Sequence, residues 1–154
     1  SKSPTPTMIY TGVGSRKTPV SRERRMKELA KKLLTKNDVP YIDFGTYVGK
    51  DCDYNEYVAA AVGSMKNKVS DFGMGFCRTG QGVNILANHL PGVRSALVID
   101  EYTAEYSIRH NCVNFFAVPE KYISEDMLDR MIKIWKDTTF DGGRHMTRMK
   151  KTMG

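Results

Sequence analysis

The chain alternates strand-like and helix-like patterns about five times along its 154 residues, and this alternation limits its fold more than any other feature. Short apolar runs typical of buried strands are each followed by a stretch with the apolar spacing of a helix. Repeated β-α units of this kind form a parallel sheet with helices packed on its faces. The sequence therefore predicts an α/β protein, a three-layer α/β/α sandwich around a five-stranded parallel sheet.

The predicted elements can be placed along the chain. The expected strands are Met8–Val13, Val39–Phe44, Asp71–Phe76, Ser95–Ile99 and Val113–Val118. The expected helices begin at Thr18–Pro19, near Tyr54, after the Cys77 turn (ending near His89), at Tyr102 and after the capping residue Ser124. Residues 1–7 are expected to form a loose tail and residues 8–154 a single domain. Ligands of such sheets bind at the carboxyl ends of the strands, so a site is expected there.

One segment, Phe76–Arg94, carries most of the candidate chemistry. Cys77 ends an apolar strand, a Thr-Gly-Gln-Gly turn follows, and a helix begins. Helix N-termini stabilise negative charge, so a thiol at this place is favoured as the thiolate and can act as a base. The amides of the same turn can hold a negatively charged oxygen. A free cysteine is more commonly a small buried hydrophobe, and a glycine turn is often only structural, but the position at a strand end favours the functional interpretation.

Histidines and arginines supply the other candidates. His110 lies in an Arg-His-Asn triplet at the mouth of the last strand, and we interpret it as functional. His89, at a helix end, is interpreted as a surface or capping residue. Arg144, His145 and Arg148 belong to a basic tail of the kind that is usually only solvated. Two arginines spaced i, i+4 can nevertheless bind one phosphate with paired donors.

Composition narrows the function classes. The chain has three cysteines without zinc-site spacing, so reduced thiols in a cytoplasmic protein are expected. No apolar run approaches the ~18 residues of a membrane span, and no secretory signal is visible. The net charge of +7 suits anionic ligands. The basic run 22–36 fits a solvated helix face better than a polyanion site, and nucleic-acid binding is the least favoured function.

Several strings of the sequence resemble one enzyme family. They are IDFGTY (residues 42–47), DYNEY (53–57), CRTGQGVNILANHLPGVRSAL (77–97), AEYSIRHNCVN (104–114) and FDGGRHMTR (140–148). Taken together, in this order and spacing, they resemble the sugar-phosphate isomerases that include type B ribose-5-phosphate isomerase and the two subunits of galactose-6-phosphate isomerase. The likeness covers roughly residues 39–150.

The resemblance implies a fold, a reaction and an assembly. Members of that family have a Rossmann-like sandwich, need no metal or organic cofactor, and form dimers or tetramers whose C-terminal tails reach a neighbouring active site. The substrate would be a phosphorylated aldose or ketose. Cys77 would take the proton from C2 of the open-chain aldose phosphate and return it to C1 through a cis-enediolate.

The resemblance also implies roles for further residues. The backbone of the loop Arg78, Thr79, Gly80, Gln81 and Gly82 would hold the enediolate oxygen. Thr79 and His110 match the ring-opening pair. The substrate-binding positions match Asn111 and Tyr54, and the phosphate-binding positions match Arg144, His145 and Arg148.

The sequence also departs from the family pattern. The first strand of the family normally ends in an Asp-His pair, whereas Thr11–Pro19 contains neither residue; Arg16 could replace the phosphate contact. Arg78 stands where the family has glycine, and its guanidinium could either favour the thiolate or crowd the sugar. These departures leave the sugar's identity open. Ribose 5-phosphate to ribulose 5-phosphate isomerisation is the leading interpretation, because the resemblance implies that LacB-like subunits lack the histidine found here at His110. A hexose-6-phosphate isomerase and a non-catalytic phosphosugar-binding subunit are the alternatives.

Overall fold

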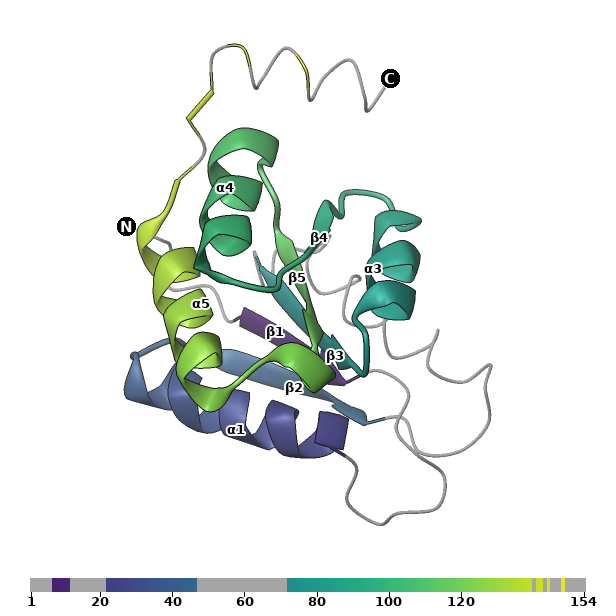
Figure 1. The fold of residues 1–154 in the computed structure, drawn as a ribbon, viewed down its shortest axis with the longest axis vertical. Helices are drawn as coiled ribbons and strands as arrows, with labels where there is room; N and C mark the ends of the chain where they lie inside the picture. The colour runs from purple at the N-terminus through teal and green to yellow at the C-terminus, as the bar shows by residue number, and fades with distance from the viewer. Residues whose placement is uncertain are drawn as a thin grey trace.

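The computed structural model describes residues 7–11, 22–46, 72–139, 141–142, 144 and 148. The elements, labelled in Figure 1, are β1 (Thr7–Thr11), α1 (Arg22–Lys36), β2 (Tyr41–Thr46), β3 (Gly73–Cys77), α3 (Gln81–Asn88), β4 (Ser95–Leu97), α4 (Glu101–Asn111), β5 (Phe115–Pro119), the 3-10 turn η1 (Glu120–Tyr122) and α5 (Glu125–Asp137). Residues 1–6 of the expected tail, the Thr18–Pro19 helix start, the helix near Tyr54 and the candidates Arg16, Tyr54 and His145 lie outside the described residues. Thr7, which was expected in the tail, begins β1.

The strands form one five-stranded sheet in the order β2-β1-β3-β5-β4, and every pairing is parallel. Side chains alternate between the two faces of a strand, and β5 shows this directly. Phe116 and Val118 point into one apolar cluster, whereas Phe115 and Ala117 point into a second cluster. Both faces of β5 are therefore buried, as expected for a parallel sheet covered by helices on both sides.

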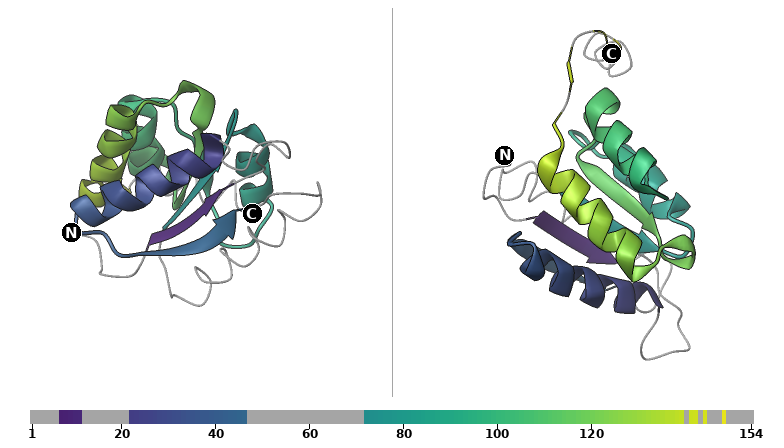
Figure 2. Two further views of the ribbon diagram at one scale, coloured as in Figure 1. Left: turned by 90° about the horizontal axis from the view of Figure 1, so that it is seen from below. Right: turned by 60° about the vertical axis from the view of Figure 1, so that its left-hand side comes forward.

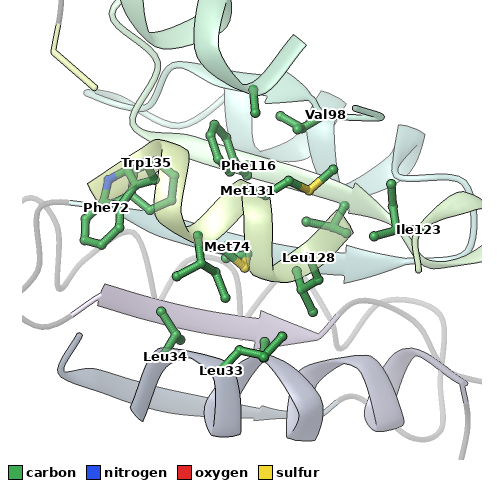
Figure 3. Close-up of a cluster of buried hydrophobic side chains, with 14 of the residues drawn as sticks. Leu33, Leu34, Phe72, Met74, Val98, Phe116, Ile123, Leu128, Met131 and Trp135 are labelled. Carbon is green, nitrogen blue, oxygen red and sulfur yellow. The ribbon is translucent and has the colours of Figure 1, made fainter. Parts of the chain in front are cut away.

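Helices cover both faces, so the predicted α/β fold with a parallel sheet is confirmed. The larger cluster packs α1, α4 and α5 on one face, with Leu34, Met74 and Trp135 among its buried side chains (Figures 2 and 3). The Phe72 ring contacts the Phe116 ring edge-on at a centroid distance of 4.8 Å. The smaller cluster packs α3 on the opposite face. All the described strands thus point their carboxyl ends at one edge of the sheet.

The ends of the elements follow local chemistry that the sequence shows only in part. Ser124 caps α5 as expected, because its Oγ accepts a hydrogen bond from the Met127 N–H at 3.2 Å. The second strand begins at Tyr41 rather than at the predicted Val39. Asp38 adopts a left-handed conformation (φ 59°), and the Val39 N–H then donates to the Leu34 carbonyl at 2.8 Å. Val39 therefore belongs to the C-terminal closure of α1.

The basic helix α1 is not simply a solvated face. The side chain of Lys27 is buried, and its ammonium lies 2.8 Å from Asp43 Oδ1 on β2. Lys31 lies 3.2 Å from the other oxygen of Asp43. Hydrogen bonds to Glu28 and Asp43 raise the pKa of Lys31. The predicted solvated interpretation was thus wrong for Lys27, which joins α1 to the sheet. Within the described ranges no helix has the length and hydrophobicity that a membrane span requires.

Candidate active site

Cys77 is the last residue of β3 and lies at the carboxyl edge of the sheet, opposite Pro119 of β5. Its side chain is half-buried and packs against the smaller apolar cluster below α3. The thiol is therefore neither sealed in the core nor fully solvated. This position matches the sequence prediction of a sulfur at a strand end, immediately before a turn.

One hydrogen bond and the backbone conformation of Gly80 fix the shape of the turn after Cys77. The Arg78 carbonyl accepts a hydrogen bond from the Lys121 N–H at 3.1 Å, which ties the turn to η1. Gly80 has φ 76°, the left-handed conformation that favours glycine. A Cβ on Gly80 would meet Leu97 Cδ1 and would lie 3.3 Å from the Pro119 nitrogen. Both the conformation and the space therefore require glycine here.

The N-terminus of α3 presents backbone donors that the helix itself does not use. The first intrahelical bond runs from the Asn84 N–H to the Gly80 carbonyl at 3.0 Å. Gly80 is the N-cap residue and supplies no side-chain cap, while Thr79 Oγ1 accepts only from the Gln81 N–H at 3.4 Å. The amides of the next two residues, Gly82 and Val83, have no carbonyl one turn earlier within the helix. This edge can therefore receive an anion.

Two residues that position the loop were missed by the sequence analysis. A Cβ on Gly75, in β3, would lie 2.5 Å from Val83 Cγ1 and 2.9 Å from Phe115 Cζ, so this glycine lets α3 approach the sheet. Lys121 is exposed, and its N–H holds the Arg78 carbonyl, which brings a cation to the same edge as Cys77. The sequence signal that could have identified Lys121 was its position just past the carboxyl end of the last strand.

His110 and Asn111 lie at the other edge of the sheet. Asp100 caps α4 by accepting the Thr103 N–H at 2.7 Å, and the helix then runs back toward the start of β5. Its last turn carries His110 and Asn111. The His110 ring packs edge-on against Tyr106 at 4.8 Å and is about one-third exposed, with a side-chain exposure of 35%. Asn111 is exposed and accepts the Arg94 Nε–H through its carbonyl at 2.7 Å.

The C-terminal segment joins this second group. The Asp141 N–H donates to the Arg109 carbonyl at 2.9 Å, and Arg109 Nε lies 3.2 Å from both carboxylate oxygens of Asp141. The hydrogen bond that Arg109 donates to the Asp141 carboxylate is the main cause that raises the pKa of Arg109. Arg144 and Arg148 follow in the chain, and both are exposed.

The structure therefore divides the predicted site residues into two groups. Cys77, Thr79 and the loop to Gly82 lie at the carboxyl edge, while His110 and Asn111 lie at the amino edge, where Asp141 of the C-terminal segment contacts Arg109. One chain does not bring Thr79 and His110 together, because the length of the sheet lies between them. A cavity of about 570 Å³ lies on the amino edge and includes Arg94 and Asn111 in its lining. It does not include Cys77.

Comparison with known proteins identifies the family. Residues 21–152 match the family model described as Ribose/Galactose Isomerase. The chain belongs to this family. It is 35% identical over 122 residues to YwlF of Bacillus subtilis (strain 168), whose name places it among sugar phosphate isomerases, with 79% of this chain and 82% of that protein covered. It is 28% identical over 117 residues to ribose-5-phosphate isomerase B of Escherichia coli (strain K12), covering 76% of this chain and 78% of that protein.

Solved structures agree with this assignment. Ribose-5-phosphate isomerase B of Clostridium thermocellum superposes with a TM-score of 0.80 at 30% identity, covering 94% of each chain. The Thermotoga maritima protein of the same name also gives a TM-score of 0.80, at 29% identity, covering 94% of this chain and 95% of that one. This protein therefore shares its fold with these two proteins, and the likeness extends beyond the cysteine loop.

Proposed function

We propose that this protein is an aldose–ketose isomerase of phosphorylated sugars, with ribose 5-phosphate and ribulose 5-phosphate as its substrate pair. The family match and the relatives that carry the name ribose-5-phosphate isomerase B support the reaction class. The family description also includes galactose, so a hexose 6-phosphate is the second candidate substrate.

The observation that carries the proposal is the arrangement at the carboxyl edge of the sheet. The Cys77 thiolate takes the proton from C2 of the open-chain sugar and returns it to C1. Negative charge then develops on the oxygen of the enediolate. The backbone N–H groups of the loop Arg78–Gly82 hold that oxygen, because preorganised N–H groups stabilise charge that forms during the reaction. The left-handed Gly80 sets the direction of these donors.

We propose further that the site is completed by a second copy of the chain in a homodimer. His110 would open the sugar ring together with Thr79 of the other subunit, and Asn111 would bind the sugar. Arg144 and Arg148, with His145, would bind the phosphate. The position of these residues away from Cys77 in one chain supports this division, because isologous dimers can place two such edges against each other. A phosphate held far from the reacting carbons supplies positioning energy.

A proton NMR assay in D2O tests the reaction. Wild-type protein is expected to convert ribose 5-phosphate to ribulose 5-phosphate with solvent deuterium entering the sugar, and galactose 6-phosphate serves as the comparison substrate. Cys77→Ala is expected to lower kcat by roughly a thousandfold or more, because it removes the base, while ribose 5-phosphate still binds. Cys112→Ala is the matched control, since that half-buried cysteine lies at the end of α4.

The outcomes separate the proposed roles. Wild-type protein that binds ribose 5-phosphate without isomerising any sugar phosphate would instead be a non-catalytic phosphosugar-binding subunit. Turnover by Cys77→Ala at the wild-type rate would exclude this sulfur as the base.

A further inference from the structure

Within the described part of the C-terminal segment, Asp141 contacts the body of the protein at α4. Its backbone N–H donates to the Arg109 carbonyl at 2.9 Å. Its carboxylate accepts from Arg109 Nε, at 3.2 Å for each oxygen. One oxygen also lies 4.0 Å from Nε2 of His110. Asp141 thus contacts two side chains in the last turn of α4, those of Arg109 and His110, and the main-chain carbonyl of Arg109.

These contacts complement the unpaired carbonyls and the partial negative charge at the C-terminus of α4. The last carbonyls of α4 have no partner within the helix, and the Asp141 N–H satisfies one of them. The helix C-terminus favours a cation, and Arg109 supplies one in the last turn. The Asp141 carboxylate adds an opposite charge beside Arg109. The segment is therefore joined to α4 by main-chain and charged contacts together, and charge-assisted hydrogen bonds are the stronger kind.

We propose that Asp141 is a positioning residue that fixes the tail arginines beside His110 and so holds them as one phosphate-binding unit. Arg144 lies three positions after Asp141 and Arg148 seven positions after it, so the direction in which this segment leaves α4 determines where both guanidinium groups lie. This inference rests on the proposed function, in which those arginines bind the substrate phosphate. Asp141 itself does not contact substrate and acts through the residues that it holds.

Glu105 is a second acidic neighbour of Arg109 and serves as the comparison for Asp141. It lies 3.8 Å from the Arg109 guanidinium at the i, i+4 spacing of the same helix. It therefore gives Arg109 a carboxylate without contacting the C-terminal segment through that pair. The 3.8 Å separation is too long for a hydrogen bond, and an exposed ion pair without one contributes little. Comparing substitutions at Asp141 and Glu105 separates the anchoring of the tail from the neutralisation of Arg109.

The experiment compares Asp141→Asn, Asp141→Glu and the control Glu105→Gln with wild-type protein, each shown to be folded by its thermal melt. Steady-state kinetics with ribose 5-phosphate give KM and kcat separately, and calorimetry gives the affinity for inorganic phosphate. Asp141→Asn is expected to raise KM roughly tenfold and to weaken phosphate binding by a similar factor, with kcat within about threefold. Asp141→Glu is expected to restore most of the lost affinity. Glu105→Gln is expected to stay within about twofold of wild type.

Two results would overturn the inference. One is that Asp141→Asn has the same KM and the same phosphate affinity as the control Glu105→Gln. The other is a loss confined to kcat, with KM and phosphate affinity unchanged. If the wild-type protein isomerises no sugar phosphate, the proposed function fails, but the phosphate titration still tests Asp141. Weaker binding by Asp141→Asn alone would then support its role, and equal binding would refute it.

Discussion

Gly80 is the residue whose replacement tests the cysteine loop most sharply. Its φ of 76° is a conformation in which an L-residue costs roughly 1–2 kcal/mol. A Cβ there would also meet Leu97 Cδ1 and lie 3.3 Å from the Pro119 nitrogen, and overpacking of this kind costs roughly 1–3 kcal/mol. Gly80→Ala should therefore lower the free energy of unfolding by about 2–5 kcal/mol.

Gly92 provides a matched control in the same chain. Its φ is 82°, and a Cβ there would have nothing within 4 Å. Gly92→Ala should therefore show only the conformational cost of roughly 1–2 kcal/mol. Urea denaturation measures both free energies, and the isomerase assay measures turnover. We expect Gly80→Ala to lose turnover because the loop donors are displaced, whereas Gly92→Ala keeps it.

A double-mutant cycle with Leu97→Ala isolates the contact between the two side chains. Removing the Leu97 side chain should recover part of the Gly80→Ala loss, with a coupling energy of about 1 kcal/mol or more. Equal stability losses for Gly80→Ala and Gly92→Ala, together with no coupling to Leu97, would refute the steric reasoning. The loop would then owe its shape to glycine conformation alone.

Two further predictions concern parts of the fold away from the loop turn. Gly75→Ala would place a Cβ 2.5 Å from Val83 Cγ1, so unfolding in urea should show a loss of about 1–3 kcal/mol that Val83→Ala partly relieves; additive losses would contradict this. Asp129 accepts hydrogen bonds from Lys133 at 2.9 Å and Asn37 at 3.0 Å, and these contacts lower its pKa below 3.8. Because the folded pKa is lowered, its stabilisation is present above the unfolded pKa and is lost as the pH falls through the folded pKa. Asp129→Asn should weaken the pH dependence of stability below about pH 4. Thermal melts from pH 2 to 7 measure this, and a pH dependence of the melting temperature equal to that of wild type would contradict the prediction.

The sequence predicted the fold because its signals are local and repeated. The apolar strands, the Ser124 cap and the helix that ends at His89 each follow from neighbouring residues. The position of Cys77 at the end of β3 followed in the same way. The sequence also indicated a turn at Gly80, but not that Leu97 and Pro119 occupy the space beside this glycine.

What the sequence did not show depends on contacts between distant segments. The burial of Lys27 depends on Asp43, sixteen residues away on a strand. The contact of Asp141 with Arg109 spans thirty-two residues and involves main-chain atoms that carry no sequence signal. The placement of His110 at the amino edge follows from the direction of α4, which must run back along the sheet to reach the next parallel strand.

The central claim is that one active site needs the cysteine edge of one subunit and the His110 edge of another. Subunit complementation measures this directly. Cys77→Ala and His110→Ala proteins are each expected to be nearly inactive alone. After they are mixed in equal amounts and their subunits exchanged, half of the dimers should be mixed, each with one intact site of two, so activity should return to about a quarter of wild type. A mixture that stays as inactive as its components, although mass spectrometry detects the mixed dimers, would contradict the shared site.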